Sequence, residues 1–139
     1  METIKIENYQ EGEEIEIHQL IKEVYDEFVL IDYSDEGNKF FYDWIESSRI
    51  TERQKEQINL LVALSESKII GMIEIRYNKN ISLLFVDKQY QGQGIAKRLF
   101  YESLKTSIQR DSTLDKFFVH ASPFFIPFFC PNTVLFSSN

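Results

Sequence analysis

The sequence has 139 residues, of which 43% are hydrophobic and 27% charged, and its net charge is −7. This is enough for one globular domain with a hydrophobic core, and no run approaches the roughly 20 apolar residues that a membrane-spanning helix needs. The single cysteine, Cys130, excludes an internal disulfide, and two histidines far apart in the sequence predict no metal site. The acidic N-terminus lacks the apolar core of a signal peptide, so we expect a cytoplasmic protein with no membrane partner.

The charge is divided unevenly along the chain. Residues 1–36 contain twelve acidic residues and two lysines, a balance of −10, whereas residues 37–139 have a balance of +3. An acidic chain argues against a nucleic-acid partner, but a divided one could present one end to a cation and the other to an anion. The acidic end could equally be the solvated face of a helix, and the sequence leaves both interpretations open.

Two helices are predicted in the first third of the chain, after a short edge strand at residues 3–8. Residues 13–28 carry apolar side chains at spacings of three and four, which is typical of an amphipathic helix with an acidic outer face. A second, shorter helix is predicted over residues 34–48, and its buried face is expected to hold Phe40, Phe41, Trp44 and Ile45. The polar residues 49–57 are interpreted as a connection.

A β-hairpin and a buried strand are predicted next. Residues 58–64 are apolar and β-rich, residues 68–77 alternate between apolar and polar, and Ser65–Ser67 would form the turn between them. The alternation predicts one buried face, formed by Ile69, Gly71, Ile73, Ile75 and Tyr77. After a further turn at 78–80, the apolar residues 81–86 are typical of a strand that is buried on both faces.

A crossover unit follows the hairpin. The glycine-containing stretch QYQGQGIAKRLF (residues 89–100) leads from the strand at 81–86 into a helix over residues 94–109. The inward side of this helix is expected to hold Ile95, Leu99, Phe100, Leu104 and Ile108. A strand at 116–120 would then lie parallel to the strand at 81–86, because a helix of this length makes a right-handed crossover between parallel strands.

The glycine stretch fits neither of two common nucleotide motifs. No glycine lies five residues before a Gly-Lys pair, as a phosphate-binding GxxxxGK[ST] loop needs, and Lys97 stands where GxGxxG has its third glycine. The first amides of the helix have no intrahelical acceptors, and Gly92 and Gly94 would let a ligand approach the backbone. With Lys88, Lys97 and Arg98 nearby, the stretch predicts a backbone cradle for a pyrophosphate.

The stretch from Val86 to Phe100 resembles the acyl-CoA-binding motif of the GNAT superfamily of N-acyltransferases. The core of that motif, Gln/Arg-x-x-Gly-x-Gly/Ala, is matched by Gln91, Gly94 and Ala96, and the order of elements extends the resemblance over residues 3–129. It implies an α/β (α+β) fold in a single domain over residues 1–139. The sheet would be mixed and mostly antiparallel, with a central splayed pair of parallel strands and flanking helices, and residues 130–139 would be an atypical tail.

The resemblance implies acetyl-CoA as co-substrate and no metal. Backbone groups of Leu84, Phe85 and Val86 would hold the pantetheine arm in the gap between the splayed strands. The pyrophosphate would be bound at the cradle by Gln91, Gly92, Gln93, Gly94, Ile95, Ala96 and Lys97. The reaction would move the acetyl group to an amine, and the acidic N-terminal region favours a cationic acceptor, either a small molecule or a protein amine.

Two residues are candidates for the general base. Glu74 lies in the strand before the motif strand and could take the proton of the amine directly or through water, and His120 is a candidate because histidine titrates near neutral pH. The alternatives without a catalytic role are an exposed strand glutamate paired with Arg76 or a neighbouring strand and a capped histidine at a strand end. A backbone amide near Phe85 or Val86 would stabilise the oxyanion.

The C-terminal part departs from the family. Where the family often has a tyrosine that protonates the leaving thiolate, this chain has Phe129, and no glycine follows Gly94. The chain therefore looks truncated, without the last strands of the family. The strand at 116–120 would have an uncovered edge that favours a homodimer, unless residues 133–136 (TVLF) pair with it. These departures leave a second function open, that of an acyl-CoA-binding or interaction domain with little or no catalysis.

Overall fold

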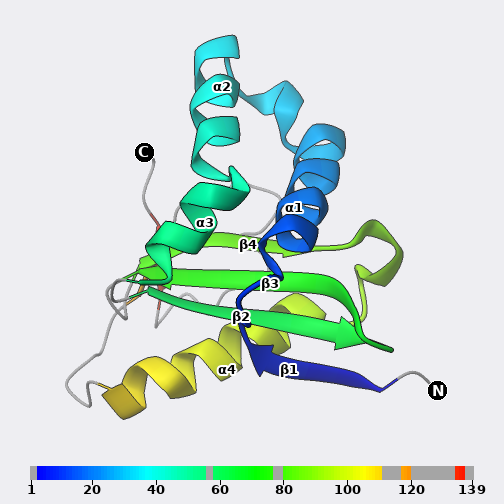
Figure 1. Ribbon diagram of the computed structural model, residues 1–139, viewed down its shortest axis with the longest axis vertical. Helices are drawn as coiled ribbons and strands as arrows, with labels where there is room; N and C mark the ends of the chain where they lie inside the picture. Colours follow the sequence, from blue (N-terminus) through cyan, green and yellow to red (C-terminus); the bar gives the residue numbers. More distant parts are fainter. Residues whose placement is uncertain (1–2, 56–57, 77–79, 111–116, 120–133, 137–139) are drawn as a thin grey trace.

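The computed structural model describes residues 3–55, 58–76, 80–110, 117–119 and 134–136. Figure 1 shows helices packed around one sheet. The elements follow one another in the order β1 (Ile4–Asn8), α1 (Glu14–Phe28), the 3-10 helix η1 (Leu30–Asp32), α2 (Asp35–Trp44), α3 (Ser47–Arg53), β2 (Ile58–Ser65), β3 (Lys68–Arg76), β4 (Asn80–Val86), the 3-10 helix η2 (Lys88–Tyr90), α4 (Ile95–Arg110), β5 (Phe117–Val119) and β6 (Val134–Phe136).

The described strands form one sheet in which β1 to β6 lie side by side in the order of the sequence. Strands β1 to β4 are antiparallel neighbours, whereas β4 with β5 and β5 with β6 pair in parallel. The prediction of a mixed, mostly antiparallel sheet with a parallel pair at the motif strand is therefore confirmed. Helix α4 makes the expected connection between β4 and β5.

Helices α1, α2 and α3 lie on one face of the sheet and α4 on the other (Figure 1). Strand β3 lies between these layers, and Ile70 and Met72 are as fully buried as Ile73 and Ile75. The alternation along this strand predicted one buried face only. That prediction is wrong because helices cover both faces of a strand in the middle of the sheet.

Helix α4 packs closely on the sheet at Gly71 of β3. A Cβ atom at this position would lie 3.2 Å from Cδ1 of Leu99 in α4 and 3.4 Å from the carbonyl oxygen of Phe85 in β4. The first distance is tighter than an ordinary contact, so glycine is what allows α4 to approach the sheet here. The apolar stripe predicted for α4 ends before its last turns, because Ile108 is 45% exposed instead of turned inward.

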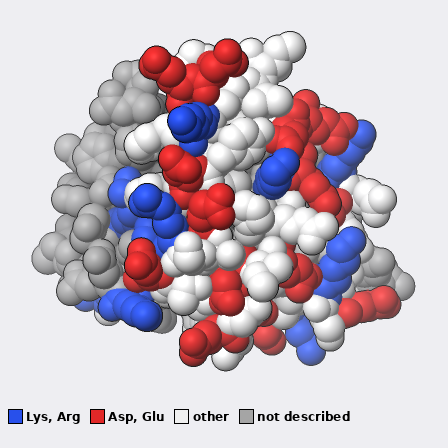
Figure 2. All heavy atoms as spheres, turned by 45° about the horizontal axis from the view of Figure 1, so that its top comes forward, with Lys and Arg blue, Asp and Glu red and all other residues white. Residues whose placement is uncertain are grey.

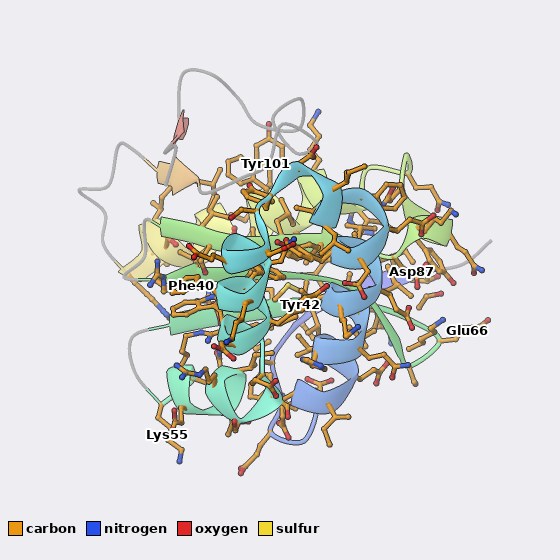
Figure 3. The ribbon with its side chains drawn as sticks, turned by 90° about the horizontal axis from the view of Figure 1, so that it is seen from above. Phe40, Tyr42, Lys55, Glu66, Asp87 and Tyr101 are labelled. Carbon is orange, nitrogen blue, oxygen red and sulfur yellow. The ribbon has the colours of Figure 1, made fainter. Side chains whose placement is uncertain are left out.

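The second predicted helix is divided in two. Helix α2 ends at Trp44, and α3 occupies most of the segment that we interpreted as a connection. Ile50 accounts for the difference, because its fully buried side chain anchors this short helix in the core. The predicted buried face of α2 is only partly right. Ile45 is fully buried, but Phe40 is 73% exposed and points away from α1 in Figure 3, whereas Tyr42 lies toward α1.

The turn between β2 and β3 is formed by Glu66 and Ser67, as predicted. Both residues have positive φ angles, 50° and 70°, and the flanking Ser65 and Lys68 are paired across the hairpin. Two successive positive φ angles are typical of a type I′ turn, which favours Asn and Gly. The Glu66 turn lies at the same end of the sheet as Asp87, which follows β4 (Figure 3).

The tail of the chain contributes the last strand of the sheet. β6 pairs in parallel with β5, with Phe118 opposite Leu135 in the register. The predicted pairing of the TVLF segment is therefore confirmed over three residues, and the expectation that β5 has an uncovered edge is wrong for this part of the strand. His120 and Phe129 lie outside the described residues.

Candidate functional site

The segment between β4 and α4 is fastened to the end of β4 by side-chain hydrogen bonds. The carboxylate of Asp87 accepts a hydrogen bond from the backbone N–H of Gln89 (2.9 Å), which caps the short helix η2. The side chain of Gln91 reaches back to the strand, and its Nε2 donates to the carbonyl of Val86 (2.9 Å). Gln91 therefore links the end of the strand to the start of the glycine segment.

Gly92 and Gly94 have φ angles of +82° and +80°, in the left-handed region that residues with a side chain rarely adopt. A Cβ atom on either glycine would meet no described heavy atom within 4 Å. The backbone conformation, and not a lack of space, is thus what requires glycine at both positions. The open space beside them fits a ligand that contacts the backbone, as the predicted cradle requires.

The first turn of α4 presents N–H groups beside these glycines. The backbone N–H of Arg98 donates to the carbonyl of Gly94 (3.0 Å), which is the first bond of the helical ladder. The N–H groups of Ile95, Ala96 and Lys97 precede it and have no acceptor four residues back within the helix. Together with the positive end of the helix dipole, these groups can hold an anion such as a pyrophosphate.

The basic residues around the cradle have different roles. Lys88 forms an ion pair with Glu27 of α1 (2.5 Å), and Nη2 of Arg98 donates to the carbonyl of Ile4 in β1 (3.0 Å). Both side chains therefore tie this segment to neighbouring elements. Lys97 is exposed, and its side chain forms no ion pair with the described residues. Of the three cations predicted to surround an anion, Lys97 is therefore the one whose side chain forms no ion pair among the described residues and could face a ligand.

The backbone groups of β4 divide into two sets. The N–H of Asp87 donates to the carbonyl of Ile70 in β3 (2.8 Å), so this pair of opposite residues is hydrogen-bonded. Hydrogen-bonded and non-hydrogen-bonded pairs alternate along antiparallel strands. The register runs without a break from Asp87 back to Phe85, so Phe85 and Met72 form the next hydrogen-bonded pair. The N–H and C=O groups of Leu84 and Val86 therefore point away from β3. Of the three residues predicted to hold a pantetheine arm, these two face the side on which β5 lies.

Strand β5 meets β4 only at the start of β4. Phe118 pairs with Asn80 and Val119 with Ile81, and among the described residues no strand pairs with the remainder of β4 on this side. The outer edge of β4 from Ser82 onward, which leads to the cradle, is thus open within the described part of the chain. This arrangement is compatible with the predicted gap between splayed strands.

Glu74 is fully buried, with an exposed fraction of 0%. Its Oε1 accepts hydrogen bonds from Nε of Arg53 (3.1 Å) and Oγ of Ser82 (3.0 Å). Its Oε2 accepts from the same Nε (3.2 Å) and from Nε2 of Gln54 (3.2 Å). The alternative of an exposed glutamate paired with Arg76 is therefore wrong, because Glu74 turns toward α3. A role as general base stays a prediction.

The ring of Trp44 makes cation–π contacts with the two arginines of this region. The guanidinium carbon of Arg53 lies 4.1 Å from the centre of the Trp44 ring, and that of Arg76 lies 5.0 Å from it. Nη1 of Arg53 also donates to the carbonyl of Trp44 (2.7 Å). Sequence reasoning missed Arg53 and Gln54 because they fell in the supposed connection. A basic residue within an otherwise polar segment gives no signal that it will pair with a buried carboxylate.

Acidic side chains are spread over the face that carries α1, α2 and α3, with basic ones between them (Figure 2).

Some of the acidic side chains also form hydrogen bonds that connect or stabilise the helices. Partial burial disfavours ionised Asp26, but hydrogen bonds from Lys22 and the Tyr42 hydroxyl outweigh it and lower the pKa of Asp26. The hydrogen bond between Tyr42 and Asp26, together with partial burial, raises the pKa of Tyr42 to about 12. Glu16 accepts a hydrogen bond from the N–H of Ile69 (2.8 Å).

Neither a metal centre nor a membrane span is found in the described ranges. No group of three or more His, Cys, Asp or Glu side chains among these residues could hold a metal ion. No helix in the same ranges is long and apolar enough to cross a membrane. The Nδ1 atom of His18 lies 2.7 Å from the carbonyl of Ile45, which gives this histidine a structural contact between α1 and the end of α2.

Comparisons with known proteins agree with this geometry. A family model described as an acetyltransferase (GNAT) domain matches residues 29–130. No curated protein sequence matches the chain significantly. Among solved structures, a GCN5-related N-acetyltransferase from Rhodopseudomonas palustris superimposes with a TM-score of 0.75 at 18% identity, covering 92% of this chain and 79% of that one.

Two further solved structures contain bound molecules. The PaiA N-acetyltransferase of Thermoplasma acidophilum in complex with coenzyme A has a TM-score of 0.66 at 20% identity, over 78% of this chain and 74% of that one. An aminoglycoside acetyltransferase from an uncultured soil metagenomic sample, in complex with sisomicin, has a TM-score of 0.60 at 23% identity. That match covers 88% of this chain and 80% of the other. At these identities the structures show a shared fold.

Proposed function

The chain belongs to the GNAT family of acetyltransferases, and on that premise we propose that it transfers an acetyl group from acetyl-CoA to an amine. The observation that carries the proposal is the turn from β4 into α4. Two glycines with positive φ stand beside helix-start N–H groups that have no intrahelical acceptor, at the end of a strand whose outer edge is open in the described part of the chain. This combination suits a long ligand with a pyrophosphate at one end.

The donor would lie along β4 and around the start of α4. The amides from Gly92 to Lys97 would bind the pyrophosphate, because those at the helix start have no intrahelical acceptor. Gln91 would shape the loop, since its N–H donates to the carbonyl of Lys88 (3.4 Å) and its side chain to that of Val86. The outward N–H and C=O groups of Leu84 and the outward N–H of Val86 would hold the pantetheine arm, since the carbonyl of Val86 already accepts from the Gln91 side chain. The N–H of Val86 would also suit a developing oxyanion, whereas the N–H of Phe85 is directed toward β3.

The transfer itself needs few groups from the protein. The nitrogen of the amine attacks the thioester carbon, a C–N bond forms, the C–S bond breaks, and the thiolate of CoA leaves. The amine has to lose a proton, for which Glu74 and His120 are the candidates predicted from the sequence. A thiol has a pKa of about 8.5, so the thiolate can leave without an acid at the position of Phe129.

A cationic acceptor fits the charge of the N-terminal region. Residues 1–36 have a balance of −10, and acidic side chains are spread over the face formed by α1, α2 and α3 (Figure 2). An acidic surface raises the local concentration of a cation and speeds its binding. The similar aminoglycoside acetyltransferase was solved in complex with sisomicin, and an aminoglycoside is a polycationic amine. We therefore propose a polycationic small molecule or a protein lysine as acceptor.

A second function is favoured by the C-terminal sequence. Phe129 stands where the family often has a proton-donating tyrosine, so the domain could bind acyl-CoA without turning it over. Calorimetric titration with acetyl-CoA tests the donor site, and release of free thiol in the presence of a panel of amines tests transfer. Binding with thiol release supports the transferase. Binding without release for any amine supports the binding domain, and absence of binding rejects both.

The remaining partner predictions concern association and location. β6 is the last strand next to β5 in the described part of the sheet, and a second copy of the chain could pair with it there. We propose a homodimer through this edge, in a cytoplasmic protein without nucleic-acid or membrane partners. A molecular mass of one chain in light scattering at high concentration would reject the dimer.

A further inference from the structure

Strand β4 contains one residue more than the facing part of β3. Glu74 lies opposite Leu83 and Ile75 opposite Ile81, so Ser82 is an extra residue that forms a β-bulge. The bulge comes directly after Ile81, the last residue of β4 that pairs with the described part of β5. The local disruption of β4 and the end of its described parallel pairing therefore coincide.

The bulge determines which backbone groups face outward beyond it. A shift of one residue in a strand reverses the orientation of every following residue. If β4 continued regularly from Ile81, with Ser82 paired opposite Glu74, the groups of Phe85 would point away from β3, and those of Leu84 and Val86 would point toward it. The bulge is thus the feature that places the Leu84 and Val86 groups on the open edge next to the cradle.

A buried polar network holds the bulge. The hydroxyl of Ser82 donates to Oε1 of Glu74 (3.0 Å) and lies 3.4 Å from the carbonyl oxygen of the same residue. The carboxylate also accepts hydrogen bonds from Arg53, the last residue of α3, and from Gln54, which follows the helix. A buried carboxylate is costly unless it is paired and hydrogen-bonded, so the position of Ser82 is coupled to that of α3.

The same network limits what Glu74 can do. A carboxylate has about four sites for accepting hydrogen bonds, two on each oxygen. Here three donors surround the carboxylate of Glu74: the single N–H at Nε of Arg53 is shared between both oxygens, Ser82 donates to Oε1 and Gln54 donates to Oε2. A general base has to accept a proton from the amine or from a water molecule, whereas this carboxylate is fully buried and already accepts from three protein donors, one of which is a cation.

We propose that Arg53, Gln54 and Glu74 form a positioning network that holds the bulge at Ser82 and so aims the backbone groups of Leu84 and Val86 at the acyl donor. Glu74 is in this arrangement a positioning residue and not the base. The inference rests on the proposed function, since it takes the open edge of β4 to be where the arm of acetyl-CoA binds.

Three serine variants test the network by calorimetric titration of acetyl-CoA. We expect Ser82→Ala to weaken binding by about five- to tenfold, because it removes the hydrogen bond that fixes the bulge. Ser82→Thr keeps the hydroxyl and should stay close to the parent affinity. Ser103→Ala is the matched control, since it removes a buried hydroxyl that donates to the carbonyl of Phe100 (2.7 Å) in α4. It should lower the melting temperature without changing the affinity.

Glu74 variants separate positioning from proton transfer. We expect Glu74→Gln to raise KM for acetyl-CoA while the acidic limb of the pH profile of kcat stays in place. If this variant does not fold because Arg53 loses its partner, Arg53→Met combined with Glu74→Leu removes both charges together and leaves the bulge without its anchor. The double variant should then bind acetyl-CoA more weakly than the parent protein.

Each outcome has one meaning. Loss of the acidic limb in Glu74→Gln with unchanged affinity for acetyl-CoA would make Glu74 the base and overturn the inference. Equal affinities for Ser82→Ala and Ser103→Ala would overturn it as well, while leaving the proposed function intact. Failure of the unmodified protein to bind acetyl-CoA would reject the proposed function first, and the inference with it.

Discussion

The hydroxyl of Tyr25 donates a hydrogen bond of 2.5 Å to Oδ1 of Asn38, and both side chains are buried. The amide nitrogen of Asn38 in turn donates to the carbonyls of Leu30 (3.1 Å) and Tyr33 (3.4 Å). One side chain of α2 thus satisfies groups from α1 and from the segment between the two helices. The relative position of α1 and α2 depends on this residue.

Replacement of Asn38 by Ala should destabilise the fold by about 2–3 kcal/mol, because the buried hydroxyl of Tyr25 and the part-buried carbonyl of Leu30 lose their partner. Tyr25→Phe removes one hydrogen bond of the same group and should cost about 1 kcal/mol. The exposed neighbour Lys39 supplies the control, and Lys39→Ala should change stability by less than about 0.5 kcal/mol. Urea unfolding measures all three. Equal midpoints for Asn38→Ala and Lys39→Ala would show that the network carries no stability.

The glycines of the cradle should be sensitive to alanine. Gly94→Ala places a side chain at a φ of +80°, which costs about 1–2 kcal/mol and shifts the backbone that would contact the donor. We expect it to weaken binding of acetyl-CoA at least about tenfold, since a displaced amide loses its hydrogen bond to the anion. Gly12→Ala is the control, because Gly12 also has a positive φ, +105°, and open space around it. It should lose stability and keep its affinity.

Alkaline pH should unfold the protein through its tyrosines. Burial raises the pKa of Tyr25 to about 12, and burial with a hydrogen bond to Glu14 does the same for Tyr9. A raised pKa in the folded state favours the neutral form, so its contribution is complete below the ordinary pKa of about 10 and is lost as the pH rises toward 12. Stability should therefore fall between about pH 10 and 12.

The tyrosine prediction is measured by urea midpoints across this range, together with the absorbance of tyrosinate. Tyr42→Phe should make the alkaline decline shallower, because the Tyr42 hydroxyl that donates to Asp26 also has a pKa of about 12. Titration of every tyrosine in one step near pH 10 in the folded protein would contradict the raised pKa values.

The turn between β2 and β3 offers a stabilising change. Glu66 and Ser67 both adopt left-handed backbone angles, for which Asn and Gly are the favoured residues of a type I′ turn. Glu66→Asn with Ser67→Gly should raise the free energy of unfolding by about 1 kcal/mol. Glu66→Ala keeps the unfavourable conformation and should bring no gain. A thermal midpoint unchanged by the double substitution would argue against strain in this turn.

The sequence predicted the elements whose pattern is local. The spacing of apolar residues marked α1, α4 and the strands β2 to β4, and the glycines marked the turn before α4 correctly. It could not separate α2 from α3, because the anchor of α3 is one buried isoleucine, Ile50, within polar neighbours. It also placed Glu74 on an exposed face. Only the packing of α3 on β3 brings Arg53 to that carboxylate, and packing between distant elements leaves no periodic trace in a sequence.

The close approach of α4 to the sheet at Gly71 has a consequence for engineering the donor site. Leu99 rests on this glycine from within α4, the helix whose first turn would hold the pyrophosphate. A methyl group at position 71 would push Leu99 and the start of α4 away from the sheet. The loop between β4 and α4 would keep its length, so the position of the helix start relative to the end of β4 would change. The depth of the cradle can therefore be adjusted from β3, by a substitution that touches no residue of the binding loop.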